Sequence, residues 1–413
     1  MVQVMRHRNY GALWVGSLSA SFAMNMQQVA RGWFVYDWTS SAVDLALVTL
    51  SFMLPQVFIA LPGGVFADRH QKRKIIVGSQ LLNCIATLVM AIVILTEQVE
   101  FYHFIVFGLL NGSILALSFP ARHAMIPDVV PDSLVFSAMA LSSTSMNVAR
   151  VLAPAFAGFL IAWISAGDTN SSYGVGIVYV VITSLYFVAA ASTQIVSVRG
   201  KSRRDRSARG DLMQEINEGL RFVWRQPSVF GLIVISIIPF LFAFPLNTFL
   251  PAFNEDVLGG GPEDLGLLLS ALGIGSIVGS LMLATSGDME RKGFWLFWIC
   301  IGWGVIVLIF GFVTNFFIAM IIICLVGWCS AWNMAMNRAL IQQKTRQDIL
   351  SRVMSIDMMS HGLMPLGVLP IGLVADYFGV AVAINVSGCL FILSVALLYA
   401  TTPQIRHLLK RYG

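Results

Sequence analysis

The chain alternates between long apolar runs and short polar segments. Twelve runs of about 18–27 residues are each long enough for a helix to cross the ~30 Å hydrocarbon core of a membrane. They are continuous rather than alternating residue by residue, which favours helices over a β-barrel. The predicted spans are 10–36, 43–63, 75–95, 104–121, 137–163, 173–196, 228–250, 264–286, 294–313, 316–337, 353–375 and 378–401. The pattern predicts an all-α membrane protein with 12 transmembrane helices.

The longest polar stretch divides these spans into two sets of six. It begins with a basic run, VRGKSRRDRSARG, and continues from Asp211 with apolar residues on one helical face. A basic run of this kind is too charged to pack, and the second part suits a short helix on the cytoplasmic membrane surface. We expect an N-terminal six-helix bundle over 1–196, a cytoplasmic linker with an amphipathic helix over 197–227, and a C-terminal six-helix bundle over 228–413.

The two halves also match in sequence. A shift of 216 residues, without a gap, superposes Arg122 on Arg338, Asp132 on Asp348, Leu134 on Leu350 and Pro154 on Pro370. Together with the equal number of spans, these matches indicate an internal repeat and hence two pseudo-symmetric bundles. Membrane proteins built from such repeats are mostly transporters, with a substrate site near the midplane between the halves.

The basic residues indicate the orientation. All but two of the 26 Lys and Arg residues fall in the termini and in every second gap between spans, and only Arg31 and Arg150 lie inside spans. Lys and Arg collect in cytoplasmic loops, so both termini are expected to be cytoplasmic. The net charge of +5 is then explained by loops near anionic lipid, and no nucleic-acid partner is expected.

The composition leaves little room for other chemistry. The chain is 57% hydrophobic and only 11% charged, with a mean hydropathy of +0.79, so no soluble domain is large enough for a separate activity. No phosphate-binding loop for ATP and no Ser-His-Asp arrangement is found. The five cysteines lie in apolar runs without metal-ligand spacing to histidine. We expect no enzyme activity, no cofactor and no metal site.

Ionisable groups inside a membrane are costly and are therefore candidates for function. Asp357 is the only acid in any predicted span, and His361 lies four residues further along the same helix face. Both side chains can take up and release protons, as a proton-coupled carrier requires. The alternative for Asp357 is a local ion pair with Arg352 at the cytoplasmic end of the span.

Other polar residues in the spans are candidates for a substrate cavity. Arg150 either binds an anionic group or balances Asp357, or it pairs with backbone carbonyls or Asn147. Arg31 either lines the cavity or extends outward toward Asp37. The asparagines either bind substrate or link helices. The predicted cavity residues are Gln28, Arg31, Asn111, Arg150, Asn247, Asn333 and Asn337.

Three prolines, Pro239, Pro245 and Pro251, fall in the seventh span. Proline removes intrahelical hydrogen bonds and permits bending, so this span is expected to act as an outer gate.

The segment after the second span, GGVFADRHQKRK, resembles the loop 2–3 signature of the major facilitator superfamily, with Gln71 where that family usually has glycine. A weaker copy, Gly287-Asp288, follows the eighth span. The resemblance implies two six-helix bundles around a central cavity that opens alternately to each side. The alternative is that the basic cluster only anchors the topology. The implied gate residues are Gly64, Asp68, Arg69, Lys72, Arg73, Arg122, Asp288 and Arg338.

A narrower resemblance covers most of the chain. The run from Phe119 to Ile161, the entry MRHRNYGALWVGSLSA and the segment QEINEGLRFVWRQPSV are similar to an exporter branch that includes macrolide-efflux and enterobactin-exporting proteins. The resemblance implies a monomeric secondary transporter in the bacterial cytoplasmic membrane, with protons and membrane lipid as partners. It would export a small amphipathic molecule, such as a drug, siderophore or metabolite, by proton antiport with alternating access.

Three alternatives stay open. One is a carrier that flips lipid or lysolipid on the same fold. Another is an organic-anion:proton symporter, for which Arg150 and Arg31 would be substrate ligands. The third is a sensor or scaffold that does not transport.

Overall fold

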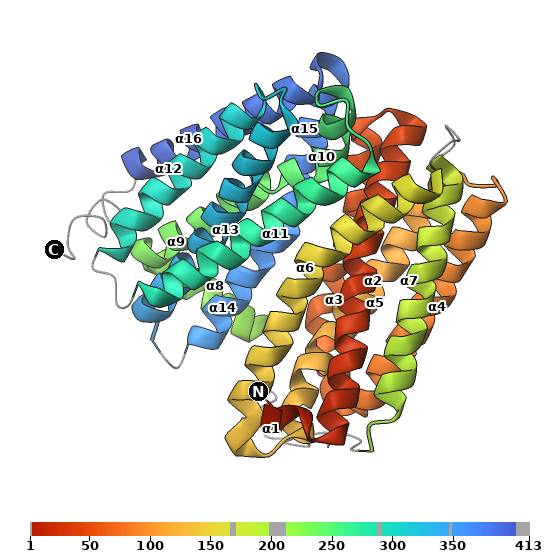
Figure 1. The fold of residues 1–413 in the computed structure, drawn as a ribbon. Coiled ribbons are helices and arrows are strands. Elements are labelled where there is room, and N and C mark those ends of the chain that lie inside the picture. The colour runs from red at the N-terminus through yellow and green to blue at the C-terminus, as the bar shows by residue number, and fades with distance from the viewer. Residues whose placement is uncertain (1, 166–170, 198–211, 287–290, 347–348, 402–413) are drawn as a thin grey trace. The chain divides into compact units, whose positions relative to one another are not determined.

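The computed structural model describes residues 2–165, 171–197, 212–286, 291–346 and 349–401, and within these ranges the regular structure is entirely helical (Figure 1). Side chains at 2–3, 60–69, 171, 212–217, 351, 355 and 361 are outside this description. The chain divides into two compact units. Unit 1 contains residues 1–40, 47–205 and 260–270, and unit 2 contains residues 41–46, 206–259 and 271–413.

Unit 1 is built from the first half of the helices. Within it, α7 packs against α4 and α2, while α6 packs against α2, and α4 packs against α5. The first-half elements are α1 (Val2–Met5), α2 (Arg8–Thr39), α3 (Ala42–Arg69), α4 (Lys72–Leu95), α5 (Phe101–Val129), the 3-10 turn η1 (Asp132–Leu134), α6 (Val135–Ser165) and α7 (Ser171–Gln194).

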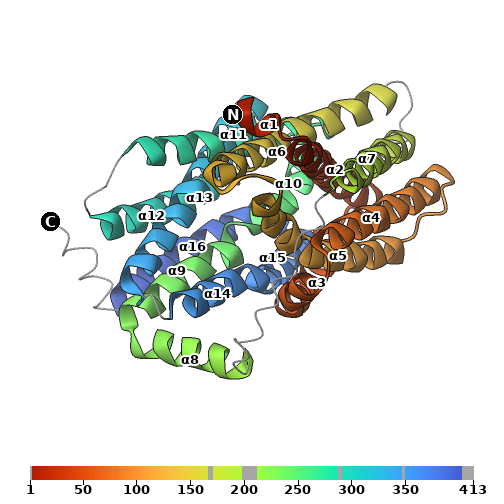
Figure 2. The ribbon, with the colours of Figure 1, turned by 90° about the horizontal axis from the view of Figure 1, so that it is seen from below.

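Unit 2 is built from the second half. Here α16 packs against α12 and α15, and α9 packs against α13 and α16, while the short helix α8 lies beside α14 and α9 (Figure 2). The elements are α8 (Leu212–Arg225), α9 (Pro227–Phe242), α10 (Pro245–Asp256), α11 (Pro262–Thr285), α12 (Lys292–Phe310), α13 (Phe316–Lys344), α14 (Leu350–Met359), the 3-10 turn η2 (Ser360–Leu363), α15 (Met364–Phe378) and α16 (Val380–Thr401).

Eleven segments of the described chain are long and apolar enough to cross a membrane. They correspond to the second to twelfth predicted spans. The first predicted span forms the 32-residue helix α2, which is long enough but is not among the eleven. The all-helical membrane architecture is therefore confirmed, and the twelfth crossing rests on the length of α2.

Two helices extend further than their apolar runs, which corrects the placement of two arginines. The fourth predicted span ended at residue 121, but α5 continues to Val129, and the tenth ended at 337, but α13 continues to Lys344. Arg122 and Arg338 therefore lie inside helices and not in the loops after them. A hydropathy pattern ends a span at a charged residue, whereas an α-helix continues through it because arginine is a good helix former.

Two helical segments of unit 2 are interrupted. The seventh predicted span breaks at residues 243–244, where the N–H groups of Ala243 and Phe244 both bond to the carbonyl of Pro239, at 2.8 and 2.9 Å. Pro245 begins the next helix because it has no N–H to continue the previous one. The prolines therefore coincide with an interruption of this span, and its expected role as an outer gate stays a prediction.

The eleventh span also breaks, at η2, although its sequence predicted a continuous helix. Pro365 cannot donate a hydrogen bond to the carbonyl four residues earlier, and the chain tightens into a 3-10 turn just before it. Interrupted membrane helices are tolerated where protein or a water-filled cavity surrounds the freed backbone groups. One such group is the Phe242 carbonyl at the first break, which accepts a hydrogen bond from the Ser387 hydroxyl.

Glycines allow close approach of helices in both units. A Cβ added at Gly112 in α5 would overlap the carbonyl oxygen of Phe52 in α3, and a Cβ added at Gly275 in α11 would overlap that of Cys324 in α13. Small residues at such crossings let the backbones pack directly, which is a main source of helix association in membranes.

Each unit also contains a short segment from the other half of the sequence. In unit 2, the Asp376 carboxylate accepts the N–H of Ala42 at 2.6 Å and the hydroxyl of Ser41 at 3.0 Å. A carboxylate at this position favours the positive N-terminus of α3. In unit 1, the hydroxyl of Ser270 donates to the carbonyl of Val151 at 2.6 Å.

Candidate functional site

A small pocket in unit 2 contains the predicted coupling residue Asp357. Side chains from α9, α13 and α14 surround it, together with Phe244, which lies at the break before α10. The lining residues are Ser236, Pro239, Phe240, Phe244, Asn333, Met334, Arg338 and Asp357. The pocket therefore combines one acid and one base with aromatic and apolar walls.

Asp357 is 1% exposed and has two polar neighbours. Its Oδ1 accepts a hydrogen bond of 2.5 Å from the Ser236 hydroxyl, and its Oδ2 lies 3.8 Å from Nε of Arg338. The alternative pair with Arg352 is not what forms around this carboxylate, because the Arg352 guanidinium lies against Glu218 of α8. The carboxylate is therefore held by one hydroxyl and one more distant guanidinium, and not by a bidentate ion pair.

Two of the predicted asparagines lie near this pocket. Asn333 lines it and donates from Nδ2 to Sγ of Cys300 at 2.9 Å. Asn337, next to Arg338 in sequence, is buried without lining the pocket and donates to the Leu232 carbonyl at 3.1 Å, so it links α13 to α9. The interhelical alternative therefore describes Asn337, whereas Asn333 both links helices and faces the pocket.

His361 falls in η2, two residues beyond Met359, where α14 ends. The expected i, i+4 relationship with Asp357 assumed a continuous α-helix, and the 3-10 turn interrupts that geometry. The His361 side chain lies outside the described part of the chain, so its coupling role stays a prediction.

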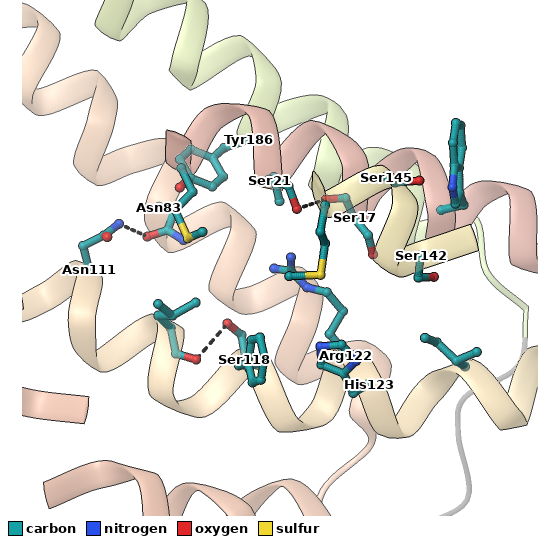
Figure 3. Close-up of a pocket in the computed structure, with 17 residues that line it drawn as sticks. Ser17, Ser21, Asn83, Asn111, Ser118, Arg122, His123, Ser142, Ser145 and Tyr186 are labelled. Atoms are coloured by element: carbon teal, nitrogen blue, oxygen red, sulfur yellow. Dashed lines mark hydrogen bonds between the residues drawn. The ribbon is translucent and has the colours of Figure 1, made fainter. Parts of the chain in front are cut away.

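A larger pocket lies within unit 1, between α2, α4, α5, α6 and α7 (Figure 3). Its walls carry serine hydroxyls, two asparagines, a tyrosine, and apolar side chains. The lining residues are Trp14, Ser17, Ala20, Ser21, Met24, Asn83, Asn111, Leu115, Ser118, Phe119, Arg122, His123, Ile126, Ser142, Ser145, Met146 and Tyr186.

Arg122 is the main charged group of this pocket. Its Nε atom is buried and has no hydrogen-bond partner among the described residues. The neighbouring His123 packs its ring edge-on against Phe119, with the centroids 4.6 Å apart. The lining contains no Asp or Glu. The sequence assigned Arg122 to the gate motif, and the match with Arg338 in the internal repeat was the signal that could have placed it in a pocket.

Asn111 is the one predicted cavity residue that this pocket includes. It donates from Nδ2 to Oδ1 of Asn83 at 3.0 Å (Figure 3), and both side chains are buried. Tyr186 from α7 lines the same wall. The apolar runs gave no signal for Asn83 or Tyr186, because a single asparagine or tyrosine in a membrane helix is common.

Four other predicted cavity residues line neither pocket. The guanidinium of Arg31 lies over the ring of Phe52, 5.2 Å from its centroid, which is a cation–π contact. Gln28 and Arg150 are exposed on their helices, and Asn247 is half-buried near the start of α10. Their substrate contacts stay predictions.

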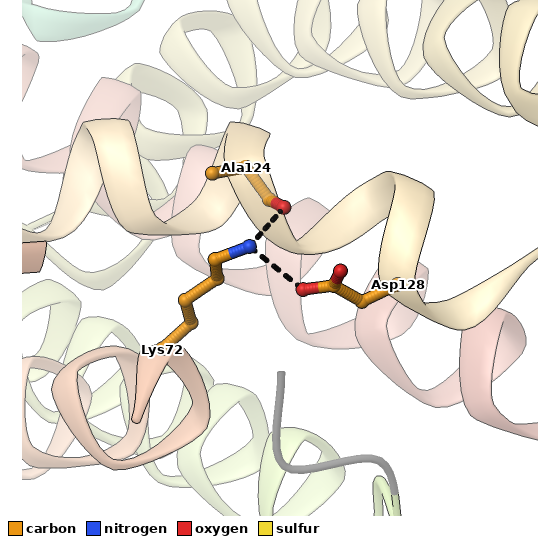
Figure 4. A network of polar contacts seen from close by, with 3 residues as sticks. All are labelled: Lys72, Ala124 and Asp128. Carbon is orange, nitrogen blue, oxygen red and sulfur yellow. Dashed lines mark hydrogen bonds and ion pairs between the residues drawn. The ribbon is translucent and has the colours of Figure 1, made fainter. Parts of the chain in front are cut away.

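The basic residues after the second span tie helices together within unit 1. Nζ of Lys72 lies 2.7 Å from the Asp128 carboxylate and 2.8 Å from the Ala124 carbonyl, which joins α4 to α5 (Figure 4). Arg73 donates to the carbonyl of Val196 at 2.7 Å, just beyond α7. The surroundings of Gly64 and the side chains of Asp68 and Arg69 are outside the description, as is the whole of Asp288, so their gate role is untested.

Among the described residues, no group of three or more His, Cys, Asp or Glu side chains is placed to hold a metal ion. The two pockets contain groups that can bind a ligand without a metal. They provide hydroxyl and amide groups, two arginines, one acid and apolar walls, and this combination suits the binding of a molecule that is partly polar and partly apolar.

Comparisons with known proteins identify the family to which this chain belongs. The family model described as "Transmembrane secretion effector" matches residues 2–407. Macrolide efflux protein A of Streptococcus pyogenes is 23% identical over 399 residues, 96% of each chain, and the staphyloferrin A transporter of Staphylococcus aureus is 23% identical over 87% of this chain and 88% of its own.

Solved transporter structures share the fold. A bacterial homologue of the human lysosomal transporter Spinster has a TM-score of 0.73 at 13% identity, with 98% of each chain covered. A D-xylose–proton symporter has a TM-score of 0.70 at 13% identity, again with 98% of each chain covered. The chain belongs to the transmembrane secretion effector family of the major facilitator superfamily, and it is therefore a membrane transporter and not an enzyme.

Proposed function

We propose that this protein exports a small amphipathic molecule in exchange for protons, and that Asp357 carries the coupling proton. Relatives named for macrolide efflux and for staphyloferrin A transport support export of a small molecule. The family alone does not specify the driving ion, so the proposal of proton exchange rests on Asp357.

The observation that carries this proposal is the burial of Asp357 in a pocket with a single nearby base. The carboxylate is 1% exposed, and Nε of Arg338 lies 3.8 Å away. Protonation of Asp357 removes the charge that holds Arg338, and loss of the proton restores it. Each proton taken up or released therefore changes which groups the pocket presents, which is the differential interaction that a coupled conformational change requires.

The interrupted helices support the same site. Ser236 belongs to α9, which breaks seven residues later at Ala243, and Asp357 lies in α14, three residues before η2. Breaks of this kind localise bending, so a change in charge at Asp357 acts beside two points where the backbone can move.

A transport assay tests the proposal. Cells that lack their own pumps, with and without the protein, are loaded with amphipathic dyes, and retention is followed before and after a protonophore. We expect lower retention with the protein, abolished by the protonophore. Unchanged retention for every dye and for a fluorescent lysolipid would contradict export of amphipathic molecules, whereas lysolipid movement insensitive to the protonophore would favour the lipid-flipping alternative.

Substitution then tests the residue. Asp357→Asn should abolish uphill efflux and keep downhill exchange, because the neutral amide mimics the protonated acid permanently. The matched control is Asp132→Asn, which removes an exposed carboxylate in the η1 turn and should leave both activities intact. Uphill efflux by Asp357→Asn at the wild-type rate would refute the coupling role.

We further propose that the protein lies in the bacterial cytoplasmic membrane with both termini in the cytoplasm. The support is the concentration of Lys and Arg in the termini and alternate gaps between spans. A protease-cleavable tag at the C-terminus should be cut in inverted vesicles and protected in right-side-out vesicles, and the reverse result would overturn the orientation.

A further inference from the structure

The two pockets occupy equivalent positions in the two halves of the sequence. Under the 216-residue shift, α2 corresponds to α9, α5 to α13 and α6 to α14. Four lining residues of the unit 1 pocket then fall on four lining residues of the unit 2 pocket. The pairs are Ala20 with Ser236, Met24 with Phe240, Ser118 with Met334, and Arg122 with Arg338.

One difference between these pockets concerns charge. The residue equivalent to Asp357 is Leu141 in α6. Arg338 therefore has a carboxylate 3.8 Å away in its own pocket, whereas no acid lines the pocket of Arg122. The repeat has kept the arginine in both halves and the counter-charge in only one.

The arginine without a counter-charge is also the less well satisfied one. Nε of Arg122 is buried without a hydrogen-bond partner among the described residues. A guanidinium in a poorly hydrated site costs free energy unless an anion compensates it, and its planar fork of N–H groups matches a carboxylate, sulfonate or phosphate.

We propose that the unit 1 pocket binds the anionic group of the transported molecule, with Arg122 supplying the missing charge partner. The inference rests on the proposed transport function and specifies its substrate class as an amphipathic organic anion. Other donors line the same pocket and extend its polar surface. The hydrogen bond between Asn111 and Asn83 uses the oxygen of Asn83 and leaves its amide nitrogen as a donor, and Tyr186 adds a hydroxyl.

The other lining residues of the pocket are apolar, and they indicate that the rest of the ligand is apolar. Trp14, Met24, Phe119 and Met146 line the pocket together with Leu115 and Ile126. Aromatic and methionine side chains adapt to apolar groups of different shapes, so they suit the body of the ligand more than its charged end.

The test is direct binding to the purified full-length protein in lipid nanodiscs, without a proton gradient. The probes share one ring system and differ only in charge: 2-naphthoate, naphthalene-2-sulfonate, and the neutral 2-naphthamide. Isothermal calorimetry should show the two anions binding at least about tenfold more tightly than the amide, because only the anions satisfy Arg122.

Arg122→Gln should weaken binding of both anions about tenfold or more and leave the amide unchanged. The control for net charge is Lys74→Gln, which removes one positive charge from an exposed position on α4 and should leave anion binding unchanged. Thermal unfolding of each variant shows whether it is folded.

A second pair of variants tests whether an added carboxylate replaces the anionic ligand as the partner of Arg122. Leu141→Asp places a carboxylate where unit 2 has Asp357, and it should reduce anion binding about as much as Arg122→Gln does. Leu141→Asn introduces a similar polar group without charge and should retain most of the anion affinity.

Equal affinity for the amide and the anions, no binding of either anion, or unchanged anion affinity in Arg122→Gln would each overturn the proposal. The binding assay is independent of coupling. Selective anion binding combined with protonophore-insensitive transport would refute only the proton exchange, whereas proton-driven export without charge-selective binding would refute only the anion site.

Discussion

The Ser236 hydroxyl donates to Oδ1 of Asp357 across 2.5 Å, and this bond joins α9 to α14 beside the breaks in both spans. Bonds of this length from a hydroxyl to a carboxylate are charge-assisted and are stronger than those between neutral groups. The bond therefore positions the proposed coupling carboxylate.

Loss of that hydroxyl should impair coupling. We expect Ser236→Ala to cost about 1.5 kcal/mol or more, which corresponds to roughly tenfold slower proton-driven efflux. Ser236→Thr keeps the hydroxyl and should retain most of the rate. The measurement is initial dye efflux driven by a pH gradient in proteoliposomes. Equal rates for the alanine and threonine variants would show that the hydrogen bond is not used.

The interaction between Arg338 and Asp357 should contribute to the free energy of unfolding. Arg338→Gln leaves a buried carboxylate without its partner, and we expect a loss of about 1–3 kcal/mol, reduced from the value for fully buried pairs because the Arg338 side chain is 42% exposed. The double variant Arg338→Gln/Asp357→Asn should recover part of this loss, since the neutral amide needs no counter-charge. Denaturant unfolding in detergent measures the cycle, and strictly additive losses would show that the two residues do not interact.

The contacts of Lys72 with Asp128 and Ala124 allow a structural role of Lys72 to be distinguished from a gate role. Lys72→Met should lower stability by about 1 kcal/mol, because Asp128 and the Ala124 carbonyl lose their shared donor. Asp128→Asn should cause part of the same loss, and combining the two changes should add little. If Lys72 only joins α4 to α5, the ratio of uphill to downhill transport stays at the wild-type value. A changed ratio with unchanged stability would instead support the gate role.

The packing at the break in the seventh span predicts an intolerant glycine. A Cβ at Gly367 in α15 would overlap the carbonyl of Leu241 in α9, whose usual partner in a continuous helix, the N–H of residue 245, is absent in proline. Gly367→Ala should therefore destabilise the protein by about 1–3 kcal/mol. The matched control is Gly302→Ala in α12, where a Cβ meets nothing within 4 Å and the change should stabilise by about 0.5–1 kcal/mol. Similar unfolding temperatures for the two variants would contradict the close packing.

Several features of the site were accessible from residue patterns. Asp357 is identifiable from the sequence because an acid inside an apolar run costs free energy to bury in a membrane. The structure places it in a pocket. The three prolines of the seventh span indicate bending, and the structure places a break at 243–244, directly before Pro245, which has no N–H. Asn111 and Asn333 were identified as polar residues in spans, and each lines one of the two pockets.

Other features depended on partners far away in the chain. Asn83 becomes part of a site only because α4 packs against α5 beside Asn111. Arg122 and Arg338 were assigned to loops because hydropathy ends a span at a charge. Arg31 lies over an aromatic ring and Arg150 is exposed on its helix, and their predicted contacts with substrate stay untested.

The formation of membrane helices depends on the local sequence, whereas the binding sites between them depend on how the helices pack. A run of about twenty apolar residues must satisfy its own backbone hydrogen bonds, so the helices and their approximate bounds follow from the residues in order along the chain. Whether an arginine inside such a helix has a carboxylate beside it depends on which helix packs against it and at what rotation. That packing places Asp357 beside Arg338 and leaves Arg122 facing a pocket without an acid, because the residues that compensate a buried charge lie in helices that meet only after the chain has folded.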